Sequence, residues 1–164
     1  MKTILLATDG SPSAKEAAKT AIELAKATGW RLRALTVWRI PVVTSYGYVA
    51  MDYVPELAQA EREHAGNVVA DVVEAARAAG VDAISELRQG DTVDEICAAA
   101  EETNADFVVL GAHGWGALKR LVFGSVSLAV LHQAPCPVLV VRAPDGEEAV
   151  ELETTGTVKG TTER

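Results

Sequence analysis

The sequence is poor in cysteine, in aromatic side chains and in long hydrophobic runs, and each shortage excludes a class of protein. Its two cysteines, Cys97 and Cys136, have a spacing that fits neither a metal site nor a redox CxxC motif, so we expect reduced, structural thiols. Aromatic residues make up 5% of the chain, which argues against a binding face of stacked rings. No run approaches the roughly 18 apolar residues of a membrane span, and the short apolar run before Asp9 does not fit a signal peptide. We therefore expect a cytoplasmic protein that does not bind a membrane.

The chain also has fewer basic than acidic side chains. The chain has 15 Lys and Arg residues against 23 Asp and Glu residues, a net charge of −8. This argues against a nucleic-acid partner, because such proteins need a basic surface to displace counterions. The carboxylates are unevenly spread, since residues 110–143 contain three basic side chains and no acidic one. A buried strand–helix–strand unit can produce such a stretch by chance, and an anion site would require it.

A length of 164 residues predicts one domain. We place it at residues 1–143, because residues 144–164 are acidic, rich in Thr and Gly and aperiodic, as is typical of a disordered tail. Apolar segments of strand length are expected at residues 2–8, 31–38, 81–88, 106–110 and 137–141. Helical patterns are expected at residues 12–28, 55–79, from 92 onward and 118–132, with a loop over residues 39–54.

Local sequence features mark several helix ends. Ser11 is a good N-cap with Pro12 at the first helical position, and Gly29 is a typical stop. Thr92 and Glu95 form a capping box that opens the third helix.

Short apolar strands that alternate with helices require a parallel sheet that is covered on both faces. With right-handed crossovers, the leading topology is a three-layer, doubly wound α/β fold of five parallel strands, similar to a Rossmann fold. Ligands bind to such sheets beyond the carboxyl ends of the strands, where the strand order reverses. We therefore expect a site at the loop after the first strand, at Asp9, and at the loop after the fourth, from Gly111 onward.

The most informative stretch is the glycine-rich segment over residues 110–127. It is not a Walker loop, because no Gly-Lys-Ser/Thr occurs, and it is not a dinucleotide fingerprint, because Lys119 stands where a third glycine is needed. Its pattern is Gly111-x2-Gly114-x9-Gly124-Ser125. Glycines let backbone N–H groups approach phosphate oxygens closely, and a helix that starts near Gly124 would aim free N–H groups at an anion. The alternative is that the glycines serve loop turns only.

This spacing resembles the nucleotide-binding signature of the universal stress protein family. The resemblance covers residues 1–142 and includes the end of the first strand at Asp9, the pair Gly90-Asp91 and the last strand from Pro137. It implies a sheet with the strand order 3-2-1-4-5, a homodimer, and membership of the branch of the family that binds ATP. Carried over to this chain, the resemblance implies nucleotide contacts from Thr8, Asp9, Val37, Gly111, Ala112, Gly114, Gly124, Ser125, Val126 and Ser127.

The implied roles differ along that set. Asp9 and Val37 would border the adenine and the ribose, and the glycines with Ser125 would hold the ribose and phosphates. Thr8 and Ala112 would line the pocket through their backbones. Asp9 has an alternative role as a cap for the turn into the first helix.

Two positions depart from the family pattern. Ala112 stands where a serine is frequent, which removes a polar contact, and Trp115 stands where a basic or polar residue is common. His113 is a candidate general base, although a histidine between loop residues is more often a hydrogen-bonding spacer. The sequence leaves open the roles of Lys119, Arg120, the three tyrosines between residues 46 and 53, and the tail.

The resemblance implies a protein that binds ATP, with Mg²⁺ held through the phosphates, and that uses occupancy as a signal in a stress response through an unidentified protein partner. We expect slow ATP hydrolysis at most, because the loop offers mainly backbone N–H groups. The rival interpretation is a nucleotide-independent dimeric adaptor of the same fold. A ligase or hydrolase is disfavoured, because the loop after the first strand lacks the required Ser-Gly-Gly-x-Asp-Ser type motif.

The expected dimer uses the fifth strand, residues 137–142. This strand lies at an edge of the implied sheet, begins at Pro137 and carries no charge until Arg142. A bare apolar edge favours aggregation unless it is covered or paired, and a second copy would pair it about a two-fold axis. The alternative is that the acidic tail covers it.

Overall fold

The computed structural model describes residues 1–40, 55–114 and 123–143, so the expectations for the tyrosines, Trp115, Lys119, Arg120 and the tail lie outside the described residues. The strands are β1 (Thr3–Ala7), β2 (Arg31–Trp38), β3 (Ala83–Gln89), β4 (Phe107–Gly111) and β5 (Val138–Val141). The helices are α1 (Pro12–Thr28), α2 (Pro55–Ala78), α3 (Thr92–Glu102) and α4 (Ser125–Gln133). Each strand lies within two residues of its expected position at either end.

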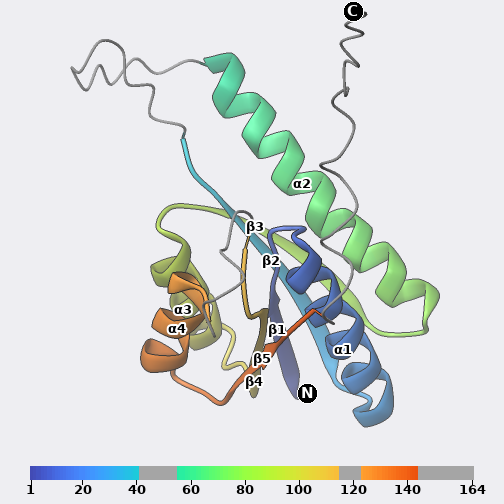
Figure 1. Ribbon diagram of the computed structural model, residues 1–164. Coiled ribbons are helices and arrows are strands. Elements are labelled where there is room, and N and C mark those ends of the chain that lie inside the picture. Colours follow the sequence, from blue (N-terminus) through green and yellow to red (C-terminus); the bar gives the residue numbers. More distant parts are fainter. Residues whose placement is uncertain (41–54, 115–122, 144–164) are drawn as a thin grey trace, which may run out of the picture.

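All five strands run parallel in the order β3-β2-β1-β4-β5, which confirms the predicted fold (Figure 1). β1 lies at the centre, with Leu6 opposite Ala34 of β2 on one side and Val109 of β4 on the other. The strand order therefore reverses between β1 and β4, and the carboxyl ends of these two strands diverge into loops on opposite sides.

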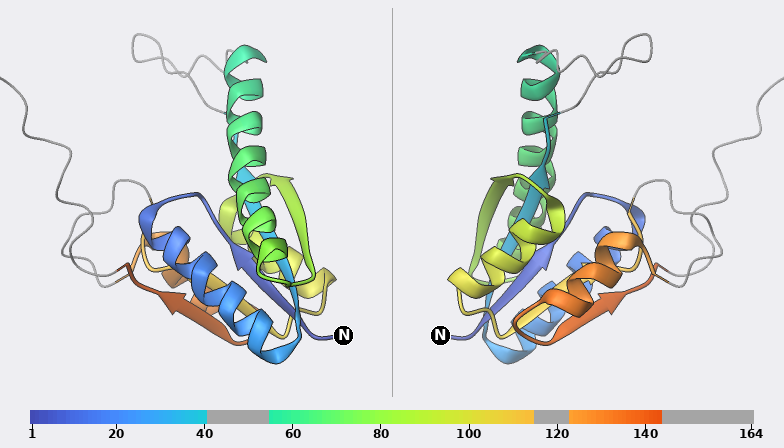
Figure 2. Two further views of the ribbon diagram at one scale, coloured as in Figure 1. Left: turned by 90° about the vertical axis from the view of Figure 1, so that its right-hand side faces the viewer. Right: turned by 90° about the vertical axis from the view of Figure 1, so that its left-hand side faces the viewer.

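Two helices cover each face of the sheet, so the molecule has three layers (Figures 1 and 2). The α1–α2 face buries Ile4, Leu6, Leu32 and Val109 against small residues of α1 and valines of α2. The opposite face buries other members of the same strands against α3 and α4. Strands that are buried on both sides explain why the sequence shows continuous apolar runs instead of alternation. In Figure 2, α2 extends beyond the end of the sheet.

The first helix follows its local sequence features closely. The Ser11 hydroxyl accepts a hydrogen bond from the N–H of Ala14, and Pro12 occupies the first turn. Gly29 ends the helix with a φ of 70°, a left-handed conformation that glycine adopts without strain. Alanines fill the buried face of α1, so its backbone lies close to the sheet.

Two helix starts differ from expectation. The N-cap of α3 is Asp91, whose carboxylate accepts from the N–H groups of Val93 and Asp94, so the predicted capping box at Thr92 is wrong by one residue. In the described part of the chain, α4 starts at Ser125 instead of continuing from residue 118. Gly124 is extended and donates its N–H to the carbonyl of Ala112, which takes it out of the helix.

No helix among the described residues is both long and apolar enough to cross a membrane.

Candidate functional site

A cavity of about 610 Å³ opens where β1, β2 and β4 end. Its volume is within the range of small-molecule sites, and it lies at the reversal of strand order where such folds bind ligands. The described residues that line it are Ala7, Thr8, Asp9, Ala14, Leu35, Val37, Thr92, Ile96, Leu110, Gly111, His113, Gly114, Gly124, Ser125, Val126 and Ser127.

Nine of the ten residues named from the sequence line this cavity, and Ala112 does not. Ala112 is fully buried, and its backbone is engaged in the fold. Its N–H donates to the carbonyl of Val141, and its carbonyl accepts the N–H of Gly124. Ala112 therefore anchors the loop after β4 to neighbouring elements instead of facing the cavity. Whether any of the ten residues contacts a ligand stays a prediction.

The start of α4 forms one end of the cavity. Its N-cap, Gly124, provides no side chain, and the first hydrogen bond of the helix runs from the N–H of Leu128 to the carbonyl of Gly124. The N–H groups of Ser125, Val126 and Ser127 precede that bond. They belong to the donors that every helix leaves without a partner inside the helix in its first turn. Together with the helix dipole, they make this end of the cavity suited to an anion.

The Ser127 hydroxyl is directed at the backbone. It is buried and lies 2.9 Å from the carbonyl oxygens of both Ala112 and Gly124. Its single proton donates to one of these carbonyls, which fastens the first turn of α4 to the end of β4. Ser127 therefore has a structural role whether or not a ligand is present.

The turn after β1 forms the adjoining wall. Asp9 is exposed, and its Oδ1 accepts the N–H of Ser11 at 3.0 Å, so the capping role weighed for Asp9 is present. Its Oδ2 lies 2.8 Å from the point that a Cβ on Gly114 would occupy. A side chain at residue 114 would therefore collide with the carboxylate. Asp9 and Gly114 thus face each other across the edge of the cavity.

Ser11 connects the two loops of the site. It is fully buried, and its hydroxyl donates to the carbonyl of His113 at 3.2 Å while it accepts the N–H of Ala14. Sequence reasoning identified Ser11 as a helix cap and missed this second contact, because the contact joins residues 102 positions apart. The contact uses the His113 carbonyl, so the role of the His113 imidazole, as general base or hydrogen-bonding spacer, stays a prediction.

Gly111 has a packing role that the spacing pattern does not reveal. A Cβ there would lie 2.7 Å from the backbone nitrogen of Ala14 and 2.7 Å from the carbonyl carbon of Ser13. Atoms cannot approach that closely, so the end of β4 packs against the first turn of α1 only because residue 111 has no side chain. The first glycine of the pattern is thus required by the fold.

The other end of the cavity is apolar. Leu35 and Val37 of β2 line it together with Ile96 of α3, and this wall continues into the core between the sheet and α3. Sequence reasoning missed Ile96 and Thr92. The strand order would have indicated them, because a helix that follows β3 starts beside the end of β2.

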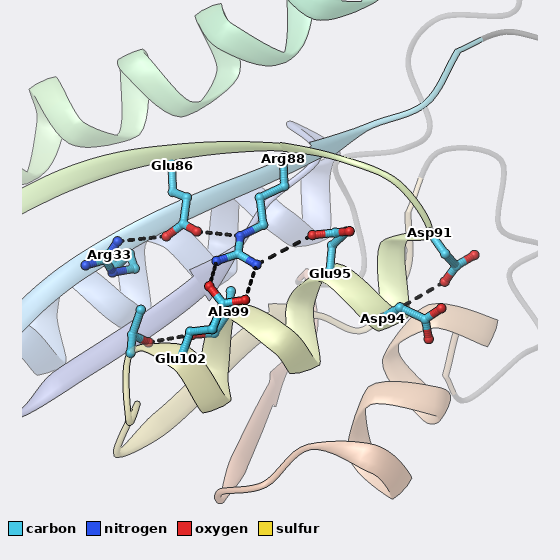
Figure 3. Close-up of polar contacts among 9 residues, drawn as sticks. Arg33, Glu86, Arg88, Asp91, Asp94, Glu95, Ala99 and Glu102 are labelled. Carbon is cyan, nitrogen blue, oxygen red and sulfur yellow. Dashed lines mark hydrogen bonds and ion pairs between the residues drawn. The ribbon is translucent and has the colours of Figure 1, made fainter.

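Ion pairs hold α3 against β3 (Figure 3). The guanidinium of Arg88 bonds Glu102 with its Nη2 at 2.6 Å and lies 3.5 Å from Glu95, both on α3. It also bonds Glu86 on its own strand, and Glu86 in turn pairs with Arg33 of β2. The hydrogen bond to Glu102 is the main cause of a raised pKa at Arg88, and it lowers the pKa of Glu102. The outer wall of the cavity is therefore fixed by charges as well as by apolar contacts.

Comparison with known proteins assigns this arrangement to one family. Residues 1–142 match the model of the universal stress protein family. A universal stress protein from Thermus aquaticus is 39% identical over 141 residues, which cover 86% of this chain and 98% of that protein. One from Methanocaldococcus jannaschii is 35% identical and covers 89% of this chain and 85% of its own length.

Solved structures agree. The universal stress protein UspA from Lactobacillus plantarum superposes with a TM-score of 0.76 at 28% identity, covering 86% of this chain and 97% of that one. A universal stress protein solved in complex with cAMP superposes with a TM-score of 0.65 at 26% identity, covering 87% of this chain and 97% of that one.

Proposed function

The chain belongs to the universal stress protein family, and from this membership and the cavity we propose that it binds an adenine nucleotide, ATP with Mg²⁺, at the ends of β1 and β4. The observation that carries the proposal is the division of one cavity into two chemically different ends. Uncapped N–H groups at the start of α4 suit phosphates, and the apolar wall of β2 and α3 suits a purine ring. A related structure that contains cAMP supports the same ligand class.

Mg²⁺ fits this site as a partner of the phosphates. Among the described residues that line the cavity there is no lysine or arginine, and Asp9 supplies the one carboxylate. Backbone N–H groups carry only partial charges, so a triphosphate needs a cation to offset its charge. Mg²⁺ keeps much of its water shell and is usually held by phosphates with one or two carboxylates. Its chemistry here would be charge neutralisation.

We propose that occupancy, and not turnover, is the output. Fast phosphoryl transfer needs cationic groups on the γ-phosphate and a positioned base or water. The described cavity wall offers hydroxyls, glycines, His113 and the Asp9 carboxylate, and no lysine or arginine to contact the γ-phosphate. Nucleotide binding would then set the state in which this cytoplasmic protein meets its protein partner in a stress response, with slow hydrolysis at most.

We also propose a homodimer through β5. Leu139 is 37% exposed at this outer strand, and Leu128 and Leu131 of α4 are each more than 40% exposed. Exposed leucines beside an unpaired strand edge are typical of a surface that a second subunit covers.

The second candidate function is a nucleotide-independent adaptor. Gly111 is required by its contact with α1, and Ser127 is engaged by backbone carbonyls, so part of the nucleotide signature has a purely structural use. This observation favours the adaptor, and the following experiment separates the two functions.

Thermal unfolding of nucleotide-free protein, with and without Mg-ATP, tests the proposal. At 100 times the dissociation constant, a ligand that binds only the native state adds about 2.7 kcal/mol. A chain of this size gains about 2–4 °C per kcal/mol, so we expect a rise of about 5–10 °C. An unchanged melting temperature at millimolar Mg-ATP would favour the adaptor.

A pair of valine variants locates the site. Gly124→Val would place a branched side chain at the start of α4, where a Cβ is already 3.2 Å from the carbonyl oxygen of Ala112, and we expect it to abolish the shift. The matched control is Gly66→Val on α2, where a Cβ meets no atom within 4 Å and which does not line the cavity. Equal shifts in the two variants would refute the site.

A further inference from the structure

Among the described residues that line the cavity, Thr92 brings a side-chain hydroxyl to the apolar wall of β2 and α3. Thr92 is the first residue of α3, and Ile96 follows one turn later on the same side of the helix. Both line the cavity, together with Leu35 and Val37 of β2. A polar group thus stands at the edge of a wall that is otherwise suited to an aromatic ring.

This hydroxyl is available to a ligand. Within residues 1–40, 55–114 and 123–143, Thr92 has no side-chain hydrogen bond, which is also true of Ser125 at the start of α4, whereas the other two hydroxyls of the cavity are engaged. Thr8 accepts the N–H of Gly10, and Ser127 donates to a backbone carbonyl. Thr92 is half-buried, so water can pair with its hydroxyl, and a ligand that hydrogen-bonds to this hydroxyl exchanges that water for itself.

Neighbouring contacts hold Thr92 in a fixed position. Asp91 caps α3 by accepting the N–H groups of Val93 and Asp94, the second of which is drawn in Figure 3. Its other carboxylate oxygen accepts from Arg39 at 2.6 Å, just beyond the end of β2. The N–H of Gly90 donates to the carbonyl of Trp38 and ties the ends of β3 and β2 together. The start of α3 is therefore attached on both sides.

We propose that Thr92 is a specificity-determining residue that recognises the base of the bound nucleotide. Its hydroxyl accepts a hydrogen bond from the exocyclic 6-amino group of adenine and so reads the polar edge of a ring that lies against Val37 and Ile96. The assignment rests on the proposed function, because phosphates at the start of α4 leave the opposite, apolar end for the base. Asp9, after β1, is the one charged side chain among the described residues that line the cavity, and the residues of β2 and α3 that line it are uncharged.

Calorimetric titration of three proteins with two ligands tests this. The proteins are the nucleotide-free wild type, Thr92→Val, which keeps the shape and removes the hydroxyl, and Thr92→Ser, which keeps the hydroxyl. The ligands are ATP and purine riboside triphosphate, which lacks the 6-amino group. A neutral hydrogen bond of about 1 kcal/mol corresponds to about fivefold in affinity.

We expect the wild type and Thr92→Ser to bind ATP about fivefold more tightly than the analogue, and Thr92→Val to bind both equally. If Thr92→Val binds ATP as tightly as the wild type, Thr92 makes no contact and the inference is wrong. If Thr92→Val lowers the affinity for both ligands by the same factor, the substitution acts on the shape of the wall, and the inference is equally wrong. A wild type that binds neither ligand refutes the nucleotide site itself. Melting curves of the free proteins, expected to agree within a few degrees, establish that each variant is folded.

Discussion

Replacing Gly111 by alanine tests whether the first glycine of the signature serves the fold or the ligand. The added Cβ would lie 2.7 Å from the nitrogen of Ala14 and 2.8 Å from the Cβ of Ser13. These atoms belong to the backbone and the short side chain of a capped helix start, so they cannot rotate away, and β4 or α1 must shift.

Overpacking of this kind costs about 1–3 kcal/mol. At about 2–4 °C per kcal/mol for a chain of this size, a cost of 2 kcal/mol lowers the melting temperature by about 4–8 °C. Gly124→Ala is the matched comparison. Its Cβ would meet the carbonyl oxygen of Ala112 at 3.2 Å and other atoms only at 3.6 Å, which a small movement relieves. We expect this variant to melt within about 2 °C of the wild type, a cost under 1 kcal/mol.

The measurement is thermal or urea unfolding of protein freed of nucleotide, so that ligand linkage does not contribute to stability. Nucleotide affinity is then measured on the same samples. We expect Gly111→Ala to lose stability before any ligand is added. A Gly111→Ala protein as stable as Gly124→Ala would refute the packing argument, and Gly111 would then have to be explained by the ligand.

Three further predictions follow from other contacts. The hydrogen bond from Arg88 lowers the pKa of Glu102 below its ordinary value of 4.5, so the folded state gains stability above that pH and loses it as the pH falls through the lowered pKa. The difference in melting temperature between wild type and Glu102→Gln should therefore shrink on acidification, and a constant difference would contradict the assignment. Burial raises the pKa of both Cys97 and Cys136, so iodoacetamide at pH 7.5 should alkylate them more slowly in native than in unfolded protein, and equal rates would speak against burial as the cause. Leu139→Asp on β5 should give a monomer by light scattering, and an unmodified chain that is already monomeric at micromolar concentration would exclude the dimer.

The parts of the fold that depend on neighbouring residues in the sequence were predictable. Ser11, Pro12 and Gly29 mark the ends of α1 through contacts within one helical turn, and apolar runs locate the strands because both faces of the sheet are buried. The start of α4 was not predictable, because it depends on a hydrogen bond between Gly124 and Ala112, which come from different elements.

The same difference between local and distant contacts applies to the candidate site. A motif indicates which residues belong near a cavity, and nine of the ten do line it. A motif does not say why each residue is there. The need for a glycine at residue 111 comes from atoms of residues 13 and 14, almost a hundred positions away, and Thr92 joins the wall through strand order alone. Such contacts have no counterpart in local sequence patterns.

The buried Ser11 hydroxyl joins the loop after β1 to the loop after β4. Under the proposed function, this contact would influence how tightly a ligand binds without touching the ligand. Fixing the backbone of one residue costs about 1–2 kcal/mol of conformational entropy. When a hydrogen bond already joins two loops in the folded chain, the loops lose this conformational entropy during folding. They do not lose it again when a ligand binds. The affinity of a ligand bound at this cavity would therefore depend partly on a hydrogen bond beneath its surface, and substitutions in the interior would change affinity while every ligand-facing residue stays the same.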